Sequence, residues 1–441
     1  MSFLTKARIP LIIGLLLLIS ASLNAAEESA SDSIRVGMGD IIIPLSNPLN
    51  DFDSNGLAWW SVTNLLMRGE AYVDDRFDLN NSIPGRSINV MLHCYIARSI
   101  SYYSHEIAHD YLFNLNGSRH FRVDWKDWSH LVPAYIQSNW QTTFSTREML
   151  DYLRKISRNE HEMYFPFIID FEAGLYQQRF NAINVAHHFE INKIINEKNA
   201  VSYLINQFED FFYILFLGDK EICKVKDQNV YVLYYVNDIN GYINLMNNDI
   251  NIFISIDDWL AASGFADFLS AHTLNSIHAL ANYLLYGDED VEPIRFRLGE
   301  KTKISFPNYY LFPSVRGLFL QTETFVDFGA KGCFLSFGSG LDAFGAHRTG
   351  PVDRLRIGGQ YQSFKLQLRW LRLNLSPYLY LDFTNRFEHR GESIGIEANL
   401  SKLGRFSLYG KIEYNRDDMI EQVIKYKDNG LYFISGLVIS M

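Results

Sequence analysis

Two histidines four residues apart, His105 and His109, enclose Glu106 in the stretch Ser104–Asp110. On an α-helix, residues four apart lie one above the other on the same face, so both imidazoles can reach one metal ion. Glu106 points beside this pair, where its carboxylate can touch a metal-bound water without becoming a ligand. The spacing therefore predicts a zinc site that activates water, with His105 and His109 as ligands and Glu106 as the general base.

The residues that flank this motif predict a long helix. Apolar side chains recur at steps of three and four from Ile88 to Leu115, and Asn116-Gly117 provides a C-terminal stop signal. Histidine and glutamate are also ordinary residues of a helix surface, so a chance match without a metal is the alternative. In apolar surroundings an unused pair of histidines and a carboxylate would be costly to bury, which favours the metal site.

A zinc ion held by two histidines of this motif needs a third protein ligand and keeps one position for water. Glu172 is the leading candidate, because it lies in a mostly apolar segment that is expected to be helical from Pro166. Gly174 beside it would permit close approach to the motif helix. A half-exposed Glu172 on an amphipathic helix is the alternative. Competing ligands are Glu162, Glu190, His187 and His188, and candidate oxyanion-stabilising groups are Tyr176, His187 and His188.

The motif His105-Glu106-x-x-His109 resembles that of the zincin metallopeptidases. A third ligand from a separate downstream helix, as Glu172 would be, is similar to the gluzincin branch. The metzincin extension, a glycine and a third histidine close behind the motif, is absent. The resemblance covers the stretch from His105 to Glu172 and implies a zinc-activated water that attacks the carbonyl of a protein or peptide substrate, with Glu106 as general base.

The first 26 residues have the pattern of a secretory signal peptide. Lys6 and Arg8 precede an apolar run from Ile9 to Ile19, and small residues follow from Ser20 to Ala26. This run is short for a membrane-spanning helix, so export with cleavage is favoured over a retained anchor. The cysteines, Cys94, Cys223 and Cys333, are too few for a disulfide framework, and a single bridge stays open.

Residues 190–287 mix helical and strand patterns. Val201–Leu217 predicts an amphipathic helix, whereas residues 229–237 and 242–256 predict a hairpin around Asn240-Gly241. Helical patterns then run from Ser255 to Gly287. His272 and His278 within this last segment are expected on helix surfaces rather than at a metal.

Beyond the acidic segment Asp288–Pro293 the period of the apolar residues changes from helical to two, and a domain boundary is expected there. Alternation is clear at Leu318–Phe328, at Ile394–Leu400 and from Leu431 to the end. Apolar-out, polar-in strands of about ten residues resemble those of small bacterial outer-membrane β-barrels. A soluble β-sandwich or a closed accessory barrel is the alternative.

These patterns predict an α+β protein with a signal peptide at 1–26, a mostly helical zincin-like domain at 27–290 and an antiparallel β-barrel of about eight to ten strands at 291–441. The expected function is an exported zinc peptidase at the outer membrane, with lipid contact through the barrel and the catalytic domain in the periplasm. Alternatives are a soluble periplasmic protease and a non-enzymatic outer-membrane channel or assembly protein. The net charge of −10 disfavours nucleic acid as a partner.

Overall fold

The computed structural model describes the following residues: 40–44, 59, 61–63, 66, 76–115, 160–217, 223–227, 230–234, 238–247, 252–287, 290–314, 317–328, 333–344, 354–361, 364–368, 371–384, 389–402, 406–417 and 430–440. The predicted signal peptide at 1–26 lies outside these residues. No helix within the described ranges is long and apolar enough to cross a lipid bilayer.

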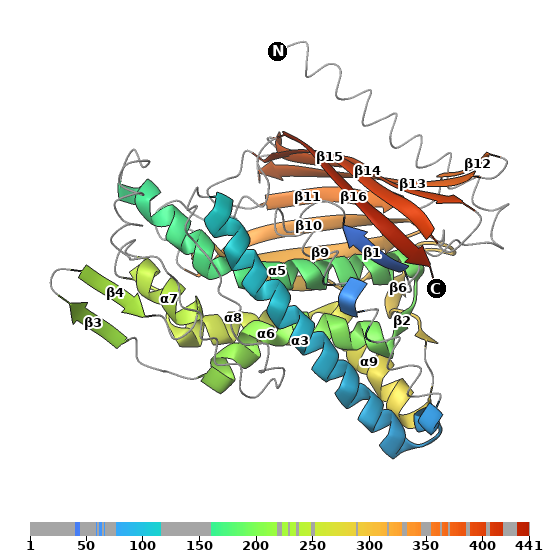
Figure 1. Ribbon diagram of the computed structural model, residues 1–441, viewed down its shortest axis with the longest axis horizontal. Helices are drawn as coiled ribbons and strands as arrows, with labels where there is room; N and C mark the ends of the chain where they lie inside the picture. Colours follow the sequence, from blue (N-terminus) through green and yellow to red (C-terminus); the bar gives the residue numbers. More distant parts are fainter. Residues whose placement is uncertain are drawn as a thin grey trace, which may run out of the picture.

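Helices and antiparallel sheets make up an α+β fold, as the sequence predicts (Figure 1). The helices are α3 (Ile83–Leu115), α5 (Glu160–Asn192), α6 (Glu197–Leu217), α7 (Asp238–Leu245), α8 (Ile256–Leu269) and α9 (Ala271–Tyr286), preceded by the short 3-10 helix η1 (Leu79–Asn81). The motif helix is confirmed as α3, which ends directly before Asn116-Gly117.

The main sheet contains 12 antiparallel strands in the order β1-β16-β15-β14-β13-β11-β10-β9-β7-β6, with β12 beside β13 and β8 beside β9. Their bounds are β1 Asp40–Pro44, β6 Arg295–Arg297, β7 Lys303–Ser305, β8 Asn308–Ser314, β9 Gly317–Asp327, β10 Cys333–Phe344, β11 Arg354–Tyr361, β12 Phe364–Leu368, β13 Leu371–Thr384, β14 His389–Lys402, β15 Phe406–Asp417 and β16 Gly430–Ser440. Two small sheets pair β2 (Ile195–Asn196) with β5 (Asp290–Val291), and β3 (Cys223–Asp227) with β4 (Val230–Tyr234).

The prediction of an antiparallel β region is therefore confirmed. The predicted closure of its strands into a barrel is not found. Among the described strands the 12-stranded sheet is open, with β1 and β6 at its two ends. It also holds more strands than the eight to ten expected. One of them is β1, which pairs with the last strand in the register Asp40↔Ser440. Period-two alternation identifies strands but does not specify which two strands meet, so it cannot predict closure.

The predicted strand at 242–256 is wrong, because Asp238–Leu245 forms helix α7. Ile239, Tyr242, Ile243 and Met246 are all buried in one apolar cluster, and their spacing of three and four is helical. Asp238 in the first turn is also favourable at the positive end of a helix. These features outweigh the turn signal of Asn240-Gly241, which lies inside the helix.

Two other helical predictions agree with the structure, and one start is wrong. Val201–Leu217 forms most of α6, and the segment from Ser255 to Gly287 forms α8 and α9. Ser255 and Asp258 close a capping box at the start of α8. Helix α5 begins at Glu160 and not at Pro166, where the sequence predicted its start; acidic residues at a first turn favour such an earlier start.

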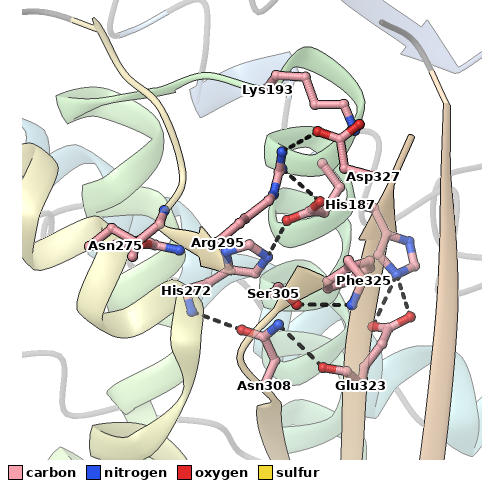
Figure 2. A network of polar contacts seen from close by, with 12 residues as sticks. His187, Lys193, His272, Asn275, Arg295, Ser305, Asn308, Glu323, Phe325 and Asp327 are labelled. Atoms are coloured by element: carbon pink, nitrogen blue, oxygen red, sulfur yellow. Dashed lines mark hydrogen bonds and ion pairs between the residues drawn. The ribbon is translucent and has the colours of Figure 1, made fainter. Parts of the chain in front are cut away.

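Helix α5 packs against the sheet through a network of buried charges (Figure 2). Arg295 on β6 lies 2.8 Å from Glu190 on α5 and 2.6 Å from Asp327 on β9. Lys193 also contacts Asp327, at 3.2 Å. The predicted boundary near residue 290 falls between α9 and β6, so side chains from both sides of it meet in this network.

His272 contradicts the expectation of a surface position, because its side chain is fully buried. Its ring packs against Phe189 and Phe325 and lies 3.3 Å from the Glu190 carboxylate. The helix face that carries His272 is therefore covered by α5 and β9, a tertiary contact that periodicity does not reveal. His278 is exposed, as expected.

Candidate functional site

The motif helix α3 crosses α5 at the first motif histidine, His105. This side chain is buried, with 4% of its surface exposed. Gly174 on α5 lies directly against the imidazole, so closely that a Cβ atom at position 174 would overlap the ring. The prediction that Gly174 allows close approach to the motif helix is confirmed.

Both ring nitrogens of His105 face oxygen atoms, one from the buried Gln178 amide and one from the half-buried Asp238 carboxylate. Nδ1 lies 3.1 Å from Oε1 of Gln178, and Nε2 lies 2.9 Å from Oδ2 of Asp238 at the start of α7. The rings of Tyr102 and Tyr213 stack beside the imidazole. A neutral imidazole carries one N–H group and can donate to only one of these two oxygens. When the ring proton is on one nitrogen, the other nitrogen keeps a lone pair that a cation can bind.

A buried chain of polar groups fixes the orientation of Gln178. Its amide Nε2 donates to the Ser101 hydroxyl at 3.4 Å, and Ser101 donates to Asn206 Oδ1 at 2.9 Å. Asn181 donates to Ser104 on the same side of α3. The Gln178 amide therefore presents its oxygen to His105, which places the ring proton on Nδ1 and turns Nε2 toward Asp238.

Glu209 on α6 adds an acidic group to the electrostatic environment of His105. Burial raises the pKa of Glu209, and the charges of Arg98 and His105 act in the opposite direction. A carboxyl group with a raised pKa in the electrostatic environment of a motif histidine is a feature shared with many functional sites. No spacing in the sequence connects Glu209 with the motif.

The remaining predicted residues are placed by their backbone only, because the side chains of Glu106, His109 and Glu172 lie outside the described part. His109 follows His105 by one turn of α3, on the same face. On α5, steps of about 100° per residue put position 172 roughly 160° around the helix from Gly174 and position 170 roughly 40° from it. By this geometry Asp170 shares the α3-facing side with Gly174 and Gln178, whereas Glu172 does not.

The competing ligands on α5 lie elsewhere. His187 follows Gly174 by about 20 Å along the helix at 1.5 Å per residue. Its Nε2 lies 3.1 Å from Glu323 on β9, and Glu190 is bound to Arg295. Burial lowers the pKa of His188 to about 4, which keeps this imidazole neutral. The Glu162 side chain is outside the described part.

Tyr176 was a candidate oxyanion donor. It is fully buried, and its ring packs on Phe312 of β8 at 4.9 Å between centroids, so packing accounts for it. Among the residues whose side chains the structure describes, no group of three or more metal-binding side chains is present. Among these described side chains, the candidate metal site consists of the pair His105 and Asp238.

No protein-family model, no curated protein and no solved structure matches this chain. The kind of site must therefore be inferred from its geometry. It is a buried imidazole held on one side by an amide and faced on the other by a carboxylate. Asp238 and Gln178 are the residues that sequence reasoning missed. The one local signal for Asp238 is its place at the start of a helix, which the predicted hairpin concealed.

Gly174→Ala is expected to displace His105 and, if His105 binds zinc as the sequence predicts, to lower zinc affinity at least tenfold. The added methyl group would meet the imidazole, which cannot yield easily because Gln178 and Asp238 hold both nitrogens. Metal competition with a chelator measures the change.

The matched control is Gly264→Ala on α8, where a Cβ atom would lie 3.6 Å from Phe211 in ordinary contact. Alanine in a helix interior is more stable than glycine by about 0.5–1 kcal/mol, so this control should stabilise the fold and leave zinc affinity unchanged. Equal zinc affinity in both variants would contradict the role given to Gly174.

Proposed function

We propose that this protein is a zinc-dependent peptidase in which His105 and His109 bind the metal and Glu106 is the general base. The observation that carries the proposal is the pairing of His105 Nε2 with the Asp238 carboxylate at 2.9 Å, while Nδ1 is held by Gln178. Histidines that bind metals in proteins commonly donate their other ring N–H to such a partner.

Asp238 is proposed as the third zinc ligand. It is a carboxylate that faces the ring nitrogen opposite the one held by Gln178, and oxygen from a carboxylate completes many catalytic zinc sites. Glu172, the candidate from sequence, is the alternative, although its position on α5 is less favourable. Two histidines and one carboxylate would leave a position for water.

Each residue has a distinct part in the proposed reaction. A zinc ion at this site supplies a Lewis acid and lowers the pKa of bound water to about 7. Glu106 accepts the proton of the attacking water and passes it to the leaving amine. Gln178 keeps the His105 proton on Nδ1, so that Nε2 stays available as a ligand.

We propose further that the β region closes as a barrel in the outer membrane, so that the catalytic part faces the periplasm. The support is the distribution of side chains over β14, β15 and β16. Among the described side chains of these strands, the exposed ones other than Ser435 are apolar, and some lie side by side in register, as in the row Ile394–Tyr414–Leu431. On the other face Glu413 is buried, pairs with Lys411 at 3.0 Å and accepts a hydrogen bond from Tyr378. Apolar-out, polar-in order is the inverse of a soluble sheet.

The third ligand is tested by a pair of variants, Asp238→Ala and Glu172→Ala. We expect Asp238→Ala to lower zinc affinity at least tenfold, because a ligand is lost, and Glu172→Ala to retain affinity. Zinc content after dialysis against a chelator measures both. Loss in Glu172→Ala alone would assign Glu172, and full zinc retention in both variants would contradict a carboxylate ligand from either position.

A further inference from the structure

Helices α8 and α9, which follow each other in the chain (Figure 1), carry several large apolar side chains that are exposed. Five of them are each 44–54% exposed and belong to the end of α8 and the outer stripe of α9: Phe265, Phe268, Leu269, Leu274 and Ile277. We refer to these five residues as the α8–α9 surface. Large apolar side chains gathered on one face mark a surface that is covered by a partner or by lipid.

Neighbouring elements extend this surface on both sides. Toward α6, the Phe268 ring packs on Phe208 and Phe211 at 4.9 and 5.4 Å between centroids. Toward the sheet, the backbone N–H of Ile294 donates to Asn275 on α9 at 2.9 Å. Ile294 is exposed, as are Phe296 and Phe306, whose rings lie 4.1 Å apart. The apolar character therefore runs from the helices to the edge strand β6.

The charges carried by α8 and α9 distinguish a protein partner from lipid as the group that covers this surface. From Trp259 to Gly287 the only Asp, Glu, Lys or Arg residue is Asp267, and it is buried against Arg179. Protein interfaces usually have a polar rim around an apolar centre. Here the stretch 259–287 presents no Asp, Glu, Lys or Arg to its surroundings, whereas Asp257 and Asp258 lie in the first turn of α8, at the opposite end of that helix from the α8–α9 surface. Covering this stretch with hydrocarbon therefore removes none of these charged groups from water.

We infer that the α8–α9 surface lies in the interface of a lipid bilayer, with both helices along the membrane plane. At 1.5 Å per residue the helices are about 21 and 24 Å long, less than the roughly 30 Å of a hydrocarbon core. Their apolar side chains would enter the acyl boundary, and the exposed pair His278 and Asn282, 3.1 Å apart, would reach the headgroups. This inference does not depend on the zinc site.

Nitroxide spin labels test the inference in the full-length protein reconstituted into phosphatidylethanolamine–phosphatidylglycerol vesicles. Labels are attached to Leu274→Cys or Ile277→Cys in a chain whose native cysteines are replaced by serine. The control label is at Met91→Cys on α3, a residue that is also exposed but lies outside the surface. Circular dichroism checks that each labelled chain is folded.

We expect collisions with oxygen to exceed collisions with a water-soluble nickel chelate at positions 274 and 277, and the reverse at position 91. Preference for the nickel chelate at 274 and 277 would show that the surface faces water and would overturn the inference. Protection from both reagents with dipolar broadening would show that a second copy covers it, and that result would overturn it as well. Oxygen preference at all three positions would refute a contact limited to this surface.

Discussion

Glu106→Gln is expected to lower the rate of peptide hydrolysis by roughly 10²–10⁴-fold and to leave zinc content unchanged. The amide keeps the size and shape of the carboxylate but cannot accept the proton of the attacking water. Because Glu106 is adjacent to His105 and is not a proposed ligand, the metal should remain bound. Cleavage of a fluorogenic peptide library and zinc content, measured on the same preparation, give both quantities.

The control for this variant is Glu292→Gln, which changes an exposed glutamate outside the site. It should cleave the library at the wild-type rate. Unchanged cleavage by Glu106→Gln would contradict its role as general base. Loss of zinc from Glu106→Gln would instead assign Glu106 a part in binding the metal.

Arg179→Leu is expected to destabilise the fold by about 3–5 kcal/mol, the largest stability change we anticipate for a single residue. Arg179 is fully buried between Asp210 on α6 and Asp267 on α8, at 3.1 and 2.9 Å, and it donates to the backbone oxygen of Gln207. Leucine would leave two buried carboxyl groups without their cation. Urea unfolding followed by circular dichroism measures the loss, and a change below about 1 kcal/mol would contradict this account.

Asp267→Asn is the matched variant, and its effect should depend on pH. Burial raises the pKa of Asp267 to about 7; the attraction of Arg179 is not sufficient to offset it, and repulsion from Asp210 adds to the rise. The folded state therefore keeps a proton that the unfolded chain releases near its ordinary value of 3.8.

The stability that this proton contributes is fully present below the unfolded pKa and is lost as pH rises toward about 7. Relative to wild type, Asp267→Asn should gain stability across this window, with a slope of at most about 1.4 kcal/mol per pH unit, and should show no further gain above it. Parallel pH–stability curves for the two proteins would show that Asp267 is ionised when folded.

The motif helix and its close neighbour were predictable because their signals are local. Apolar spacing and the Asn116-Gly117 stop gave the C-terminal end of α3, although the helix starts at Ile83, earlier than the apolar pattern that begins at Ile88. A glycine in an apolar helix indicated where another helix could approach. Asp238 was not predictable in this way. It lies 133 positions from His105 and reaches it only because α7 forms where an Asn-Gly pair indicated a hairpin.

The sheet shows the same division between local and long-range information. Alternation at 318–328 and 394–400 identified β9 and β14. It gave no indication that Asp40–Pro44 pairs with the last strand, nor that Glu190 and Arg295 join α5 to β6. Buried ion pairs of this kind depend on which elements meet in space, and neither partner has a distinctive pattern of its own.

Native-state zinc measurement on the wild-type protein and on His109→Ala tests the central claim most directly. We expect about one zinc ion per wild-type chain after removal of loosely bound metal, and far less than one in His109→Ala, because a catalytic site needs three protein ligands. A folded wild-type protein that retains no zinc would contradict the metallopeptidase. Equal zinc in the two proteins would show that the metal, if present, is not held by the second motif histidine.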